Sequence, residues 1–153
     1  MASKARTIQS AIQVILAILI VVLGYVLYTS IVEPYQRVVR AREVTELTRT
    51  RMDMVRQAMI QYERRNGRFV SELDSLVLWL RTDSFMVLRS DSIFGRSINL
   101  DSLPYSPRTG KAFVLQVNDT SDVHIYQLVD PDSNDKIGAL LPDPTLLNAA
   151  SWE

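Results

Sequence analysis

The densest cluster of side chains that could bind a metal ion lies at residues 130–135, which read Asp-Pro-Asp-Ser-Asn-Asp. Oxygen-bearing residues at alternate positions, here Asp130, Asp132 and Asn134, are how a calcium-binding loop begins. The rest of the EF-hand pattern is missing, because the sixth position is Asp135 instead of glycine and the twelfth is Leu141 instead of glutamate. A solvated turn is therefore the main expectation, with calcium bound by Asp130, Asp132 and Asn134 as the alternative.

Few other residues are of a type that could carry out catalysis. The chain has no cysteine, which excludes disulfides, thiolate metal sites and cysteine nucleophiles, and its one histidine is His124. His124 falls in a predicted strand, and a general base would need a nucleophile or carboxylate partner that the sequence does not identify. Gly110 and Lys111 lack the earlier glycine and the following Ser or Thr of a phosphate-binding loop. We therefore expect a protein that is not an enzyme, with no small-molecule substrate and no cofactor besides the calcium considered above.

These polar residues follow a strongly apolar N-terminal segment. No charged residue occurs from Thr7 to Val32, and the apolar run reaches the roughly 20 residues that a helix needs to cross a bilayer. A cleaved signal peptide is disfavoured, because the run is too long and no small-residue cleavage site follows it. We expect residues 11–32 to form a transmembrane helix, preceded by a short tail at residues 1–10. The side chains expected to anchor the helix in lipid are Val14, Leu16, Leu19, Val22, Tyr25 and Tyr28.

Charged residues are unevenly distributed, although the formal net charge is zero. Arginine exceeds acid in residues 33–68, whereas acidic residues predominate after residue 69. Arg37, Arg40 and Arg42 could contact lipid headgroups, and a solvated helix face is the simpler interpretation. Because acidic residues interleave with the arginines, nucleic acid is not expected as a partner. The positive charges on the two sides of the apolar segment are nearly balanced, so they do not orient it in a membrane.

An amphipathic helix is predicted for residues 33–67, continuing from the membrane with a kink at Pro34. An apolar stripe at helical spacing is formed by Thr48, Met52, Val55, Met59 and Tyr62. Asn66 and Gly67 then provide the signal that ends the helix. The stripe is either core packed against this chain's own sheet or a seam to a neighbouring protein. The candidate interface residues are Val38, Val44, Leu47, Thr48 and Met52.

Residues 68–141 are expected to form a small α+β domain. Residues 71–80 begin with a Ser-Glu-Leu-Asp segment similar to a capping box and continue as a short amphipathic helix. Short strands are predicted at 85–89 and 92–94, and the clearest strands at 111–117 and 123–129, joined by a hairpin loop at 118–122. A further strand is predicted within 136–141, followed by a flexible C-terminal tail at 142–153. A long helix, a short helix and then antiparallel strands indicate the α+β class.

This layout resembles that of the type IV pilins and the type II secretion pseudopilins. Residues 33–36 (Glu-Pro-Tyr-Gln) resemble the membrane exit of pilins, and residues 66–69 (Asn-Gly-Arg-Phe) resemble the turn after the pseudopilin helix. Residues 104–113 resemble the proline–glycine turn before the sheet strands. The resemblance implies a pilin-like fold in which the transmembrane helix continues as a long amphipathic helix packed against a small antiparallel sheet. The chain departs from the prepilin peptidase motif, because no glycine precedes the apolar run and no Phe or Glu occurs from Ala2 to Val32.

The resemblance implies a single-pass protein of the inner (cytoplasmic) membrane with its soluble domain on the periplasmic side. The expected function is that of a non-enzymatic structural component of a cell-envelope secretion, pilus or motility assembly. The alternative is an accessory single-span subunit docked on a larger membrane complex of the translocon or respiratory type. Expected partners are the lipid bilayer and other membrane or envelope proteins, which could include further copies of this chain.

Overall fold

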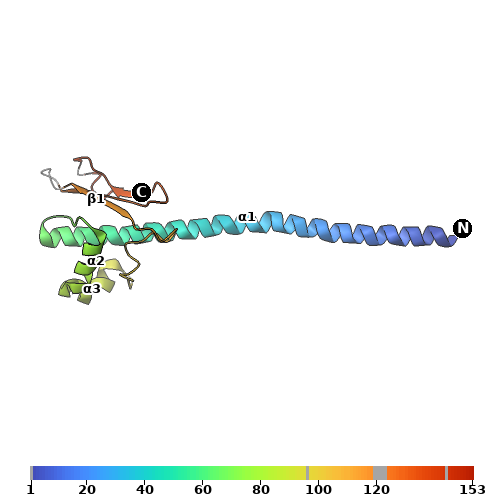
Figure 1. Cartoon of the computed structure of the whole chain (residues 1–153), viewed down its shortest axis with the longest axis horizontal. Helices are drawn as coiled ribbons and strands as arrows, with labels where there is room; N and C mark the ends of the chain where they lie inside the picture. Colours follow the sequence, from blue (N-terminus) through green and yellow to red (C-terminus); the bar gives the residue numbers. More distant parts are fainter. Residues whose placement is uncertain (1, 96, 119–123, 144) are drawn as a thin grey trace. The chain divides into compact units, whose positions relative to one another are not determined.

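The computed structural model describes residues 2–95, 97–118, 124–143 and 145–153, and of residues 2–8, 10 and 11 the backbone only. In these residues three helices precede three strands along the chain (Figure 1). The helices are α1 (Ala2–Asn66), α2 (Leu73–Thr82) and α3 (Ser84–Phe94), and the strands are β1 (Val114–Asn118), β2 (Ile125–Val129) and β3 (Lys136–Gly138). This arrangement confirms the predicted α+β class.

Helix α1 runs through both compact units of the chain, which are Met1–Glu43 and Val44–Glu153. It continues through Pro34, as the sequence predicts. Residues 2–10, expected to form a separate tail, belong to the helix, because this stretch contains no glycine or proline that would interrupt it. The helix ends where predicted, since Gly67 has a φ of 74° and its N–H donates to the Glu63 carbonyl at 2.7 Å.

The core of the second unit is built on the apolar stripe of α1. Met52, Val55 and Met59 are fully buried and belong to one apolar cluster with Tyr126 and Leu128 of β2. Within this unit the sheet lies on one side of α1 and helices α2 and α3 lie on the other (Figure 1). The stripe therefore belongs to the core of this chain, which was the first of the two alternatives considered from the sequence.

Two of the five residues that were predicted to lie at a protein interface are buried inside the second unit instead. Thr48 and Met52 have no exposed surface, and the Thr48 hydroxyl donates to the Val44 carbonyl at 2.7 Å. Both side chains are buried because the second unit begins at Val44, further back along α1 than the sequence suggests. Neither residue can contact a partner protein while the unit is folded.

The three strands form one antiparallel sheet in the order β1-β2-β3. Gln116 lies opposite Gln127, and Leu128 lies opposite Ile137. These strands fall within or close to the predicted ranges, and the predicted pairing of the first two is confirmed. Of the predicted hairpin loop at 118–122, residues 119–122 lie outside the described residues.

Helix α3 corrects the strands predicted at 85–89 and 92–94. The Asp83 side chain accepts hydrogen bonds from the backbone N–H groups of Phe85 and Met86 at 3.0 and 3.1 Å, which caps the helix start. Gly95, with a φ of 67°, ends it. A short apolar run fits both the two-residue period of a strand and the 3.6-residue period of a helix. The two caps at Asp83 and Gly95 therefore determine that this segment is helical.

Helix α2 confirms the amphipathic helix predicted at 71–80 and corrects how it begins. Leu73, Leu76 and Leu80 are its buried residues. The N-cap position is Glu72, and its side chain makes no capping hydrogen bond. The capping box predicted at Ser71 is therefore wrong.

The C-terminal segment is packed on the sheet, in contrast to the flexible tail predicted at 142–153. Ala150 forms an isolated antiparallel bridge with Ile137 of β3 and is buried. The N–H of Gly138 donates to the Ala149 carbonyl, and the N–H of Ser151 donates to the Lys136 carbonyl, both at 2.9 Å. These bonds cover the outer edge of β3 with backbone from the same chain.

Candidate functional site

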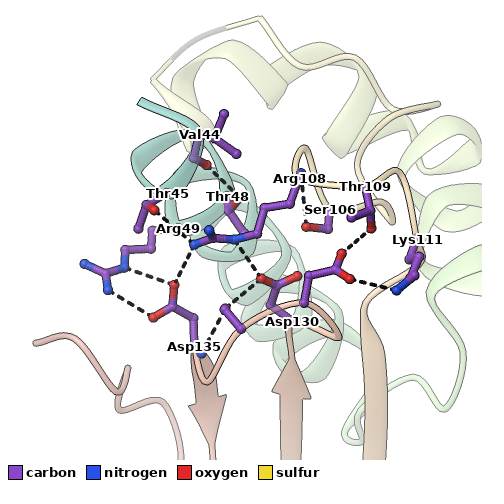
Figure 2. Close-up of polar contacts among 12 residues, drawn as sticks. Val44, Thr45, Thr48, Arg49, Ser106, Arg108, Thr109, Lys111, Asp130 and Asp135 are labelled. Atoms are coloured by element: carbon purple, nitrogen blue, oxygen red, sulfur yellow. Dashed lines mark hydrogen bonds and ion pairs between the residues drawn. The ribbon is translucent and has the colours of Figure 1, made fainter. Parts of the chain in front are cut away.

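The predicted calcium loop at 130–135 lies in a network of ion pairs (Figure 2). Asp130 is almost fully buried, and one of its oxygens accepts from Arg108 Nε at 3.1 Å and from the Ser133 hydroxyl at 2.7 Å. Asp135 accepts two hydrogen bonds from Arg49 of α1, at 3.0 and 3.2 Å. Arg108 also lies 3.6 Å from Asp135. Arg108 Nη2 also donates to the Thr45 hydroxyl of α1 at 3.1 Å, so Arg49 and Arg108 both fasten the loop to α1.

Asp132 is held by a different set of groups. It accepts a hydrogen bond from Lys111 Nζ at 2.8 Å and another from the Thr109 hydroxyl. The bonds from Lys111 and Thr109 lower the pKa of the Asp132 carboxyl, and the hydrogen bond to Asp132 raises the pKa of the Lys111 ammonium. Asn134 is exposed.

The structure therefore gives the three predicted calcium ligands different surroundings. Asp130 is paired with Arg108, Asp132 is paired with Lys111, and Asn134 faces solvent. Within the described residues, no group of three or more His, Cys, Asp or Glu side chains is placed to hold a metal ion. Calcium at this loop stays a prediction, and binding there would have to compete with two ion pairs.

A second ion-pair cluster fastens the chain's last residues to α1. Arg56 lies 2.9 Å from both Asp53 and Glu153, and it donates to the Asn148 carbonyl at 3.0 Å. The hydrogen bond from Arg56 lowers the pKa of Glu153, whereas partial burial raises the pKa of Asp53. The buried Tyr126 hydroxyl donates to the Asn148 side chain at 3.0 Å, and burial raises the pKa of this phenol. These contacts hold the C-terminal segment against the core.

His124 directly precedes β2 and is half-buried. It lines a surface hollow with residues that include Glu63, Arg64 and Phe69. Glu63 is a carboxylate neighbour that the sequence does not identify, because it lies on α1, 61 positions earlier. Ile125 and Tyr126 are both buried, and from Tyr126 onward β2 alternates between buried and partly buried residues.

The predicted lipid anchors and three of the predicted interface residues remain, and they form largely exposed apolar surface. The six predicted lipid anchors on α1 have between 51% and 68% of their side-chain surface exposed. Among the described residues, α1 is the one helix long and apolar enough to cross a membrane. Of the predicted interface residues, Val38 and Leu47 are more than half exposed and Val44 is half-buried.

Helices α2 and α3 carry a set of exposed apolar side chains that was not predicted from the sequence. It consists of Leu78 on α2 and of Phe85, Val87 and Leu88 on α3, with Leu88 83% exposed. The guanidinium groups of Arg65 and Arg89 lie over the Phe85 ring, at 5.0 and 5.6 Å from its centroid. Reading residues 84–94 as a helix would have shown that their apolar residues surround the helix and cannot all be buried.

The fold and these surfaces define an α+β chain with one helix able to span a membrane, and this layout is compatible with a pilin-like arrangement. No protein-family model, curated protein or solved structure matches the chain.

Proposed function

We propose that this chain is a non-enzymatic, single-span membrane protein that serves as a pilin-like structural component of a cell-envelope secretion, pilus or motility assembly. The observation that carries the proposal is the contrast along α1. Apolar residues between Ile12 and Ile31 are exposed, whereas the apolar stripe from Met52 to Met59 is buried by the chain's own second unit.

The exposed half of α1 needs a cover other than this chain. Leucine, isoleucine and valine around a helix are unfavourable in water and favourable in hydrocarbon, where each contributes about −0.3 to −0.6 kcal/mol to insertion. An α-helix also satisfies its own backbone hydrogen bonds, which is required in lipid. A bilayer therefore supplies the environment that the exposed residues lack.

The two ion-pair clusters described above support a structural role for the second unit. Arg49 and Arg56 of α1 pair with Asp135 and Glu153, and Arg108 joins Asp130 to Thr45 of α1. Their carboxylate partners Asp130, Asp135 and Glu153 are engaged in these ion pairs. Such clusters position surfaces for protein contacts, which is the role that we assign to the second unit.

The compartment follows from the resemblance to pilins and pseudopilins. On that basis we assign the chain to the inner membrane, with the second unit on the periplasmic side. Protease added outside spheroplasts should then remove the second unit and leave a fragment of the apolar helix protected. Degradation only after the spheroplasts are broken would reverse the assigned side.

The second candidate is an accessory subunit docked on a larger membrane complex. The exposed apolar side chains of Leu78, Phe85, Val87 and Leu88 on neighbouring helices favour it, because exposed apolar surface can mark protein contact sites. In this alternative the complex would be of the translocon or respiratory type, and the chain would be stoichiometric with it.

Extraction in mild detergent, followed by native gel separation and mass spectrometry, distinguishes the two candidates. A filament component should run as a ladder of self-assemblies in excess over any anchoring complex. A docked subunit should comigrate with one large complex at a fixed ratio. Complete release of the chain from membranes by alkaline carbonate would contradict both candidates.

A further inference from the structure

Helix α1 contains a short stretch, residues 32–43, between the exposed apolar segment and the start of the second unit. Ile31, the last large apolar residue before this stretch, is 62% exposed, and the second unit begins at Val44. The apolar segment and residues 32–43 belong to the first unit and to one continuous helix. At about 1.5 Å per residue, the stretch is about 18 Å long. Its surroundings are therefore those that a helix meets as it leaves the apolar environment.

Three arginines of this stretch, Arg37, Arg40 and Arg42, are exposed. Arg37 lies 2.5 Å from Glu33, one turn earlier on the helix. Arg40 and Arg42 make no hydrogen bond or ion pair with any residue that the structure describes. Farther along the same helix, in contrast, Arg49 is bound to a carboxylate of its own chain. Two guanidinium groups near the apolar segment are thus available to an anionic ligand.

The three arginines are distributed around the helix. Successive residues of an α-helix are about 100° apart around its axis. Counted from Arg37, Arg40 lies at about 300° and Arg42 at about 140°, so the widest gap between them is about 160°. A protein docked on one side of α1 would leave at least one of them uncovered, whereas lipid headgroups surround a transmembrane helix on every side. The distribution favours headgroups as the ligand.

The residues before these arginines place the membrane surface close to Pro34. Proline has no N–H, so within the continuous helix the Ser30 carbonyl lacks the hydrogen bond that residue 34 would otherwise donate. Such a carbonyl is unfavourable in hydrocarbon and is satisfied by water at the interface. Tyr28 and Tyr35, which are 64% and 70% exposed, are of the type enriched at membrane–water interfaces. The hydrocarbon boundary therefore fits best near Ile31.

This boundary brings the arginines to the level of the headgroups. From Ile31, Arg37, Arg40 and Arg42 are about 9, 14 and 17 Å away along the helix axis. The headgroup layer is about 5–8 Å thick on each side of a bilayer, and helical side chains lean toward the N-terminus, which here is the membrane side. The field of an anionic surface extends about 8 Å further at physiological ionic strength. All three guanidinium groups thus lie in the headgroup layer or in its field.

We propose that Arg37, Arg40 and Arg42 form an arginine collar around α1 that binds the headgroups of anionic phospholipids such as phosphatidylglycerol. A guanidinium group donates charge-assisted hydrogen bonds to phosphate, two at a time. Three arginines against Glu33 and Glu43 leave the stretch with one net positive charge, which gives a preference of about fivefold for an anionic over a zwitterionic lipid. The proposal rests on the proposed function, because it requires the apolar part of α1 to lie in a bilayer.

Fluorescence quenching by labelled lipids tests the collar in the full chain. Because the chain has no cysteine, the Ile31→Cys variant carries a single fluorophore beside the collar. The labelled chain is reconstituted in phosphatidylcholine vesicles that contain nitroxide-labelled phosphatidylglycerol or, in a parallel sample, nitroxide-labelled phosphatidylcholine. At low ionic strength the anionic lipid should be enriched about fivefold around the fluorophore, and this enrichment should fall in about 0.5 M salt.

Charge variants separate the collar from the rest of the chain. Arg40→Gln combined with Arg42→Gln leaves the stretch with one net negative charge and should abolish the preference, whereas lysine at both positions should retain it. Glu43→Gln adds one net positive charge and should raise the preference about a further fivefold. The matched control, Arg64→Gln combined with Arg68→Gln, removes two exposed arginines of the second unit and should leave the preference unchanged. All these side chains are exposed, so circular dichroism should be the same for every variant.

Several results would overturn the collar. They are equal quenching by the two lipids, a preference that survives the loss of Arg40 and Arg42, and an equal loss in the Arg64 and Arg68 control. Inorganic phosphate and chloride at the same ionic strength should act alike, and a loss caused by phosphate alone would show a free-phosphate site instead. A chain quenched equally by both lipids refutes only the collar, whereas a chain that neither lipid quenches and that does not float with vesicles refutes the membrane assignment.

Discussion

Substitution of Gly138 by alanine should be among the most destabilising small changes in the second unit. Gly138 ends β3 with a φ of 75°, and Gly110 has the same φ in an open turn. A Cβ atom at Gly138 would overlap the Tyr126 carbonyl oxygen and lie 3.0 Å from the Leu147 carbonyl oxygen, whereas a Cβ at Gly110 meets nothing within 4 Å. Both obstacles are backbone atoms, so neither can move aside as a side-chain end could.

The comparison of the two variants isolates the steric part of the cost. A left-handed φ costs a non-glycine residue about 1–2 kcal/mol, and this cost applies equally to Gly110→Ala and Gly138→Ala. Overpacking adds about 1–3 kcal/mol at Gly138 alone. Gly138→Ala should therefore lose about 2–5 kcal/mol of the free energy of unfolding, against about 1–2 kcal/mol for Gly110→Ala.

Urea unfolding of the detergent-solubilised full chain measures this difference. Trp79 and Trp152 lie in the second unit and provide the fluorescence signal. The slope against urea should be the same for both variants, so that the midpoints report stability alone. If Gly138→Ala unfolds within about 0.5 kcal/mol of Gly110→Ala, the close approach of the C-terminal segment and β2 to Gly138 is refuted.

Three further predictions concern the core, the ion pairs and the membrane segment. Met52→Ala should cost about 2–5 kcal/mol in the same urea assay, whereas Leu47→Ala on the exposed side should stay within about 0.5 kcal/mol; equal losses would contradict the assignment of Met52 to the core. The lowered pKa of Asp132, caused by Lys111 and Thr109, means that its stabilising contribution is present above about pH 4 and is lost as the pH falls through the folded-state pKa. Asp132→Asn should therefore lose less stability on acidification than the unaltered chain, and identical pH profiles would count against this ion pair. Leu19→Arg should raise the free energy of insertion by about 3 kcal/mol and reduce vesicle flotation, with Leu19→Ile as the unchanged control.

The local sequence was sufficient to predict helices and strands that have a long periodic pattern or end at a characteristic residue such as glycine. The spacing of Met52, Val55 and Met59 predicted one apolar helix face, which is buried in the structure, and Gly67 predicted the helix end. Alternation predicted β1 and β2 because each is a run of apolar and polar residues between turn residues. The apolar residues before Glu33 predicted a helix able to cross a membrane, because length and hydropathy alone decide that property.

Short elements could not be predicted in the same way. The run around Met86 and Val87 fits a strand or a helix, and the Asp83 cap together with Gly95 decides for helix α3. The exposed apolar side chains of α3 were not predicted for the same reason, since residues 85–89 and 92–94 were expected to form strands.

The amino-acid sequence by itself determined the α+β class, the apolar helix and the apolar stripe of α1, because each depends on the order of neighbouring residues. Only the tertiary structure decided what the polar residues do. Asp130, a candidate calcium ligand, pairs with Arg108, which lies 22 residues earlier in the sequence. Asp135, in the same loop, pairs with Arg49, which lies 86 residues earlier. The C-terminal segment likewise becomes ordered through contacts with β3 and Arg56. Contacts between groups so distant in the chain depend on how the elements pack, and no local pattern of residues encodes them.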